Sequence, residues 1–185
     1  MSNIILVTGG ARSGKSSFAE SLCKSQNNKT AYIATSVAFD DEMKNRVKKH
    51  QESRPKEWKT YEIYKDIYSI VEELDQKYNT VIMDCITLMV NNLMFTYNIE
   101  MDKATSEELN ELENYIKNQL TKLLEAVKKT NLYFVIVSNE IGMGIVPENK
   151  LSRIYGDFVG RANQLIGKYS EEVYLVVSGI PMKVK

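Results

Sequence analysis

The chain has 185 residues, of which 43% are hydrophobic and 26% charged, enough for one sizeable core and little for a second. Lys and Arg together number 24, as do Asp and Glu, so no net charge marks a nucleic-acid-binding protein. No stretch approaches the roughly 18 consecutive apolar residues of a membrane span, and no signal-like segment opens the chain. We therefore expect a single domain over residues 1–185, in the cytoplasm, with Cys23 and Cys85 as free buried thiols.

The first feature along the chain is a phosphate-binding motif. Residues 3–7 form an apolar run typical of a buried strand, residues 8–16 contain G-x-x-x-x-G-K-S, and an amphipathic helix is predicted from Ser17. The glycines let backbone N–H groups converge on a phosphate, and the helix N-terminus adds partial positive charge. Lys15 is then placed to reach the β- and γ-phosphates, and Ser16 to ligate Mg²⁺. An accidental glycine-rich turn is the alternative, and both flanking segments argue against it.

Further along, strand and helix patterns alternate. Strands are predicted over residues 30–35, 58–63, 80–84, 132–138, 172–177 and 182–184, and helices over 40–53, 67–74 (with Asp66 as cap), 86–95, 105–130 and 148–167. Apolar strands that alternate with helices indicate a mostly parallel sheet covered on both faces. We therefore expect an α/β, P-loop NTPase-type three-layer fold with an antiparallel C-terminal edge strand.

Polar residues follow the predicted strands at the point where each one ends. They are Thr35, Ser36, Glu62, Asp84 and the pair Asn139-Glu140. Ligands of open parallel sheets bind at the carboxyl ends of the strands, so this placement indicates a binding site. Asp84 can hold Mg²⁺ opposite Ser16, or it can cap the helix that follows; the two roles are compatible.

His50 is the only histidine, and its setting admits two interpretations. Arg46, His50 and Arg54 recur at intervals of four residues, so on a helix they share one face. A cationic face can receive a polyphosphate, and neighbouring positive charge favours the neutral, nucleophilic imidazole. The same pattern also suits a solvated basic surface. The residue pattern alone leaves both open.

Several segments together carry a family resemblance. They are residues 7–16, 32–35, 50–62 (H-x-x-x-R-P-x-x-W-x-T-x-E), 84–88 (D-C-x-T-L) with 91–93, 137–149, 160–164 and 176–183. In this order, over nearly the whole chain, they resemble the bifunctional adenosylcobinamide kinase/adenosylcobinamide-phosphate guanylyltransferase family of cobalamin assembly. The histidine segment and the segment around Ser138-Asn139-Glu140 are far more specific than the P-loop, which many enzymes share.

The resemblance implies two reactions. Adenosylcobinamide is phosphorylated by ATP or GTP; GMP is then transferred from GTP to that phosphate, giving adenosyl-GDP-cobinamide and pyrophosphate. It implies that His50 carries the guanylyl group, that Lys15 is the other catalytic residue, and that Mg²⁺ accompanies the nucleotide at Ser16 and Asp84. It also implies a homotrimer with active sites near subunit boundaries. The implied nucleotide contacts are Gly9, Gly10, Ala11, Arg12, Ser13, Gly14, Lys15, Ser16, Ala34, Thr35, Ser36, Gln51, Glu52, Ser53, Arg54, Glu62 and Asp84.

Other interpretations stay open at this point. An ordinary P-loop kinase explains the glycine-rich turn and Asp84 but gives His50 no role. A nucleotide-dependent switch would use the helix over 105–130 as a partner surface, whereas its apolar stripe favours core or subunit contact over a cofactor site. The glycines at 142 and 144 make a simple turn, or else a loop that covers the corrinoid or the phosphates.

Overall fold

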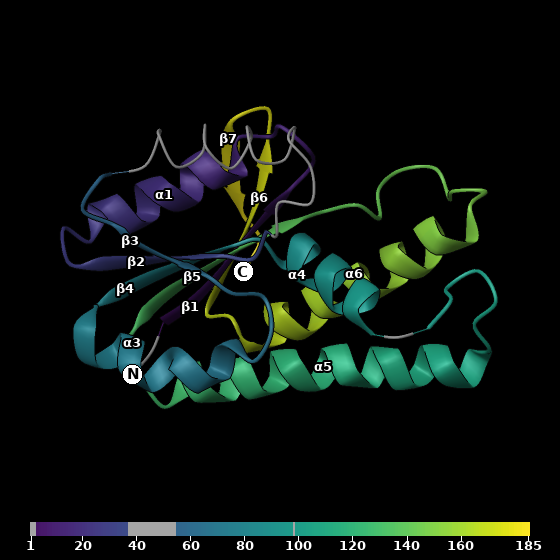
Figure 1. Ribbon diagram of the computed structural model, residues 1–185. Helices are drawn as coiled ribbons and strands as arrows, with labels where there is room; N and C mark the ends of the chain where they lie inside the picture. The colour runs from purple at the N-terminus through teal and green to yellow at the C-terminus, as the bar shows by residue number, and fades with distance from the viewer. Residues whose placement is uncertain (1–2, 37–54, 98) are drawn as a thin grey trace.

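The sheet that carries the P-loop is continuous across the molecule (Figure 1). A computed structural model describes residues 3–36, 55–97 and 99–185; the helix predicted over 40–53, and His50 with it, lies outside these residues. Within these described ranges, seven strands are arranged in the order β3-β2-β4-β5-β1-β6-β7. Their bounds are β1 Asn3–Gly9, β2 Thr30–Ala34, β3 Lys59–Glu62, β4 Thr80–Asp84, β5 Tyr133–Asn139, β6 Glu172–Val177 and β7 Ile180–Lys183.

Pairing between the strands follows the predicted pattern. The first six strands are mutually parallel where they pair, and β7 runs antiparallel to β6 at the edge. The central strands are buried on both faces, which explains why they are apolar runs instead of alternating ones. The expected α/β architecture, including the antiparallel C-terminal edge strand, is confirmed.

Helices cover both faces of the sheet, unequally among the described residues. Helix α1 packs on one face, and η1, α3, α4, α5 and α6 lie on the other (Figure 1). Their bounds are α1 Lys15–Ser25, η1 Ile67–Ile70, α3 Val71–Lys77, α4 Ile86–Thr96, α5 Ser106–Lys128 and α6 Lys150–Tyr169. None of these helices is long and apolar enough to cross a membrane. Both cysteines are free and buried, as predicted.

Side-chain alternation assigns each strand residue to one of the two faces. On β1, Ile5 and Val7 join the apolar cluster under α1, whereas Ile4 and Leu6 join the larger cluster under α4, α5 and α6. We call the face of the sheet that α1 covers the α1 face. Because the P-loop leads from β1 into α1, residues that point to the α1 face at the carboxyl edge are the ones able to meet a bound phosphate chain.

The expected role of Asp66 as a helix cap is wrong. Asp66 has a left-handed backbone conformation, with φ of 53°, and its side chain makes no capping hydrogen bond. Its Oδ1 instead accepts from Nε2 of Gln119 at 2.8 Å, and its N–H donates to Oε1 of Gln119 at 2.8 Å. Gln119 lies in α5 and is 5% exposed. A buried amide with no partner is costly, so this long-range pairing takes precedence over a local cap.

Candidate functional site

The polar residues predicted at the carboxyl ends of the strands do come together at one edge. Ala34 of β2 pairs in register with Glu62 on one side and with Asp84 on the other. Asn139 of β5 pairs with Gly9, where β1 gives way to the P-loop. By side-chain alternation Glu62 and Asp84 both emerge on the α1 face. The edge therefore presents two carboxylates on the α1 face, Asp84 two strands from the P-loop strand β1 and Glu62 four strands from it.

The P-loop turn owes its shape to a glycine and to a distant hairpin. Gly14 precedes α1 with φ of 92°, a left-handed conformation that side chains rarely adopt. A Cβ at this position would lie 3.2 Å from Cα of Gly179, in the turn between β6 and β7. Gly179 also donates its N–H to the carbonyl of Ser13 at 2.8 Å. The C-terminal hairpin thus supports the phosphate-binding turn from outside, a contact that the sequence pattern did not predict.

Lys15 is the buried cation of the site. It is the first residue of α1, only 9% exposed, and its ammonium donates to the carbonyl of Gly10 at 3.1 Å across the turn. Burial lowers the pKa of Lys15 below its ordinary 10.5, while the nearby Cys85 thiol and the Asp84 carboxylate act in the opposite direction. A triphosphate placed here would supply the negative charge that a buried ammonium needs.

The lowered pKa of Lys15 predicts how nucleotide affinity depends on pH. A bound phosphate raises the pKa of Lys15, so nucleotide binds most tightly at a pH where the ammonium is already protonated in the free protein. Binding weakens as the pH rises through the lowered pKa of Lys15 in the free protein. We expect the affinity for ATP to fall by up to about tenfold per pH unit, starting below pH 10.5. Titration calorimetry from pH 7 upward measures this.

A Lys15→Met variant is the matched control for that titration. It should bind weakly with no such slope, since it has no ammonium to lose. The Cys85 thiol does not interfere, because burial raises its pKa to about 11. A flat profile for the wild type, or an unchanged slope in the variant, would contradict the assignment.

Asp84 is held by a hydrogen bond from the neighbouring strand β2, and it does not cap a helix. The hydroxyl of Tyr32 donates to Oδ2 of Asp84 at 3.0 Å, and the N-cap position of α4 is occupied by Cys85. The capping alternative is therefore wrong. A carboxylate on β4 and the Ser16 hydroxyl in the first turn of α1 are the hard oxygen donors that Mg²⁺ takes, so the residues fit the ion.

The loop after β2 is locked to the loop after β4. The Thr35 hydroxyl donates to the Cys85 carbonyl at 2.7 Å and accepts from the Cys85 N–H at 2.9 Å. Nδ2 of Asn92 donates to the Thr35 carbonyl at 2.7 Å. Of the nucleotide contacts implied by the resemblance, Ala34, Thr35 and Ser36 therefore lie on a fixed backbone beside Asp84. Tyr32 and Asn92 lie in segments that carry the family resemblance, but their contacts with Asp84 and Thr35 were not predicted, because those contacts join residues far apart in the sequence.

The histidine segment falls outside the described residues. Gln51, Glu52, Ser53 and Arg54 are predicted to contact nucleotide and His50 to carry the guanylyl group, and the relation of this segment to the P-loop stays a prediction. The structure resumes at Pro55, and β3 then carries Glu62 to the site edge.

The segment between β5 and α6 forms neither helix nor strand. The N–H of Gly142 donates to the Glu140 carboxylate at 2.9 Å, which closes a local turn. Beyond it Met143 and Val146 are exposed, and Ile145 is 98% exposed. The turn is thus observed, and the covering role stays a prediction.

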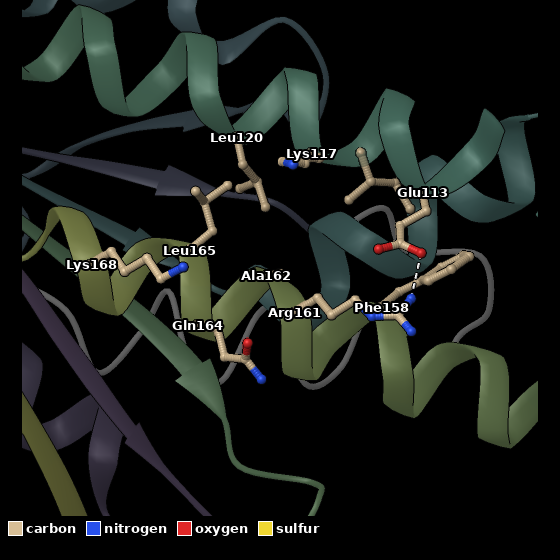
Figure 2. Close-up of a pocket in the computed structure, with 10 residues that line it drawn as sticks. Glu113, Lys117, Leu120, Phe158, Arg161, Ala162, Gln164, Leu165 and Lys168 are labelled. Carbon is tan, nitrogen blue, oxygen red and sulfur yellow. Dashed lines mark hydrogen bonds and ion pairs between the residues drawn. The ribbon is translucent and has the colours of Figure 1, made fainter. Parts of the chain in front are cut away.

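A hollow lies away from this edge, between α5 and α6 (Figure 2). Leu120, Phe158 and Leu165 supply apolar surface, and Arg161 makes an ion pair with Glu113 across the gap. Both helices belong to the layer opposite α1, and none of the predicted site residues lines the hollow. It is therefore separate from the phosphate-binding edge.

Known proteins are similar to this chain over nearly its whole length. The profile of the family described as cobinamide kinase / cobinamide phosphate guanyltransferase matches residues 5–184. The bifunctional adenosylcobalamin biosynthesis protein CobU of Escherichia coli is 40% identical over 182 residues, which cover 98% of this chain and 99% of that protein. Its Salmonella typhimurium counterpart is 41% identical over the same shares of the two chains. The CobP protein of Pseudomonas aeruginosa is 33% identical over 180 residues, covering 97% of this chain and 96% of that one.

Proposed function

Because the chain belongs to the cobinamide kinase / cobinamide phosphate guanyltransferase family, we propose that it catalyses both reactions on adenosylcobinamide. The first transfers a phosphoryl group from ATP or GTP to the substrate alcohol. The second transfers GMP from GTP to the resulting phosphate and releases pyrophosphate. The observation that carries the proposal is a buried Lys15, in a strand–turn–helix P-loop, beside Asp84 at the carboxyl edge of a parallel sheet.

In the kinase step, this chain's residues chiefly position charge. Lys15 would offset the negative charge of the β- and γ-phosphates, and the backbone N–H groups of the P-loop would hold them. Ser16 and Asp84 would hold Mg²⁺, which when bound neutralises phosphate charge. A site built this way suits phosphoryl transfer, where catalysis rests on alignment and electrostatics.

In the transferase step we propose His50 as the nucleophile. A neutral imidazole nitrogen attacks the α-phosphorus of GTP, the bond to the pyrophosphate oxygen breaks, and a phosphoramidate forms. An oxygen of adenosylcobinamide phosphate then attacks the same phosphorus and the phosphorus–nitrogen bond breaks, which regenerates the imidazole. The support is the residue type within the motif H-x-x-x-R-P-x-x-W-x-T-x-E, with Arg54 available to offset phosphate charge.

We also propose the homotrimer that the resemblance implies. The hairpin of β6 and β7 offers exposed apolar side chains at the sheet edge, with Val177, Ile180 and Met182 each about half exposed or more. Light scattering should give three times the chain mass of 21.2 kDa. A monomer mass would refute this part alone.

One experiment tests the proposed function against its two rivals. The protein is incubated with Mg²⁺ and GTP labelled at the α-phosphate, then denatured, and the chain is examined for label. We expect label that is labile to acid and stable to alkali, as a phosphoramidate is. Neither an ordinary P-loop kinase nor a nucleotide-dependent switch forms a covalent guanylyl adduct. If the chain stays unlabelled the transferase claim fails, and phosphorylation of adenosylcobinamide, assayed separately, decides the kinase claim.

A further inference from the structure

Asn139 carries a buried oxygen that nothing in the described chain satisfies. Five buried side-chain atoms lack a hydrogen-bond partner among the described residues. Two of them, on Asn3 and Thr80, lie where β1 and β4 begin, at the opposite end of the sheet from the P-loop. The other three are Thr8 Oγ1, Ser13 Oγ and Asn139 Oδ1, at the P-loop end. Buried polar atoms in native proteins are nearly always paired, so an unpaired one at this edge calls for a partner that the described chain does not supply.

The backbone at Asn139 is held on two sides. In β5 it pairs in register with Gly9, and the next residue's N–H donates to the Gly9 carbonyl at 3.0 Å. Nδ2 of Asn163 in α6 donates to the Asn139 carbonyl at 3.0 Å, and its Oδ1 accepts from the Ser138 hydroxyl at 2.6 Å. The end of β5 is thus fixed from β1 and from α6, and the side chain projects from a rigid base.

The amide itself is oriented by a chain of contacts that leads toward Lys15. Asn139 donates through Nδ2 to the Thr87 hydroxyl at 3.2 Å, and that hydroxyl lies 3.0 Å from Sγ of Cys85. The Thr87 hydroxyl has one proton, which it can give to the sulfur while it accepts from the amide. Cys85 is in turn among the groups that act electrostatically on Lys15. Asn139 is therefore linked through Thr87 to Cys85, the residue that follows Asp84.

The side chain also emerges on the correct face. Val135 and Val137 of β5 belong to the apolar cluster under α1, so Asn139, two residues further on, points to that same α1 face. Asp84 pairs with Val137 and points the same way. The free oxygen thus lies between the P-loop strand and the strand of Asp84.

The chemistry of an amide oxygen restricts what it can contact there. It accepts hydrogen bonds and does not donate, so it cannot bond the oxygens of a phosphate, which also accept. Its partner must carry a hydrogen. It adds no negative charge beside a triphosphate, unlike a carboxylate, so it can lie close to the transferred group. It is also too weak a base to remove a proton.

We infer that the Asn139 amide oxygen accepts a hydrogen bond from the substrate alcohol that attacks the γ-phosphorus, and so orients that alcohol; this rests on the proposed function. As the alcohol oxygen bonds to the γ-phosphorus, the bond from phosphorus to the β,γ-bridging oxygen breaks and the nucleoside diphosphate leaves. The alcohol proton passes to an oxygen of the transferred phosphoryl group. Asn139 aims the nucleophile and exchanges no proton.

The test separates the two reactions in an Asn139→Leu variant. We expect the kcat of cobinamide phosphorylation to fall roughly 100-fold, the scale of a lost alignment. Guanylyl transfer to supplied adenosylcobinamide phosphate, the Kd for ATP and the Mg²⁺ concentration for half-maximal rate should stay within about twofold, because the amide contacts none of these. Asn139→Ala adds no bulk and should lose kcat similarly. Asn118→Leu, the same change at an exposed position of α5, is the control and should behave as wild type.

Each other outcome overturns the inference in a distinct way. An unchanged kinase kcat means that the amide does not orient the alcohol. A parallel fall of both reactions and of ATP affinity means that Asn139 only supports the fold. If only the Mg²⁺ concentration for half-maximal rate changes, the Asn139 oxygen contacts a metal-bound water and not the alcohol. Wild-type protein that phosphorylates no cobinamide overturns the proposed function, and this inference with it, before any variant is made.

Discussion

A Lys15→Ala variant is expected to lose phosphorylation of adenosylcobinamide while it keeps its fold. Lys15 is 9% exposed and lies at the end of the P-loop turn, where its ammonium donates a hydrogen bond to the Gly10 carbonyl. The negative charge of Asp84 also acts on this ammonium. Removing a preorganised charge from such a site costs roughly 10²- to 10³-fold in kcat. The rate is measured at saturating nucleotide, so that weaker binding does not hide the catalytic loss.

The fold should tolerate this change. The alanine leaves the backbone of α1 intact, and alanine is the best helix former. Lys129→Ala is the matched control, since Lys129 is exposed at the end of α5, and it should retain full activity. Full activity in Lys15→Ala would refute the P-loop assignment. If Lys15→Ala shows no melting transition and so does not fold, the same measurement is made on Lys15→Met.

His50→Ala is expected to abolish guanylyl transfer and to leave the kinase step active. If His50 is the nucleophile, no other group forms the phosphoramidate, and loss of a covalent nucleophile costs roughly 10⁴-fold or more. Phosphorylation of adenosylcobinamide proceeds at the γ-phosphorus beside Lys15 and has no need of the imidazole. The assay follows label from α-labelled GTP onto the chain and, in parallel, label from γ-labelled ATP onto cobinamide.

The two assays in one variant make the outcome unambiguous. Label retained on the chain in His50→Ala would move the adduct to another residue and overturn the assignment. Loss of both reactions would mean that His50 serves nucleotide binding in general. A substitution at Arg54, such as Arg54→Ala, should slow guanylyl transfer without removing the adduct, because its proposed role is to offset charge.

Together the two variants would divide the proposed activities between two phosphorus atoms of a nucleotide. Lys15 and Asp84 would act where the terminal phosphoryl group leaves, and His50 would act at the α-phosphorus. Asn139 would then orient the alcohol in the first reaction only. We expect the variants of Lys15 and Asn139 to lose kinase activity and keep the guanylyl adduct. We expect His50→Ala to lose the adduct and keep kinase activity.

The sequence by itself determined the features that depend on contiguous residues. Residues 3–25 specify strand, turn and helix within one short segment, because an apolar β-branched run, glycines and a helix start each act locally. The alternation of strands and helices indicated a parallel sheet, and from it followed the placement of Glu62, Asp84 and Asn139 at one edge.

Only the tertiary structure decided which distant residues complete that edge. Tyr32 donates a hydrogen bond to Asp84, 52 positions away in the sequence, and Gly179 donates one to Ser13 from near the end of the chain. Such contacts depend on the strand order β3-β2-β4-β5-β1-β6-β7, which alternation does not specify. The buried oxygen of Asn139 became visible for the same reason: whether a polar atom is satisfied depends on every neighbour that packing brings to it.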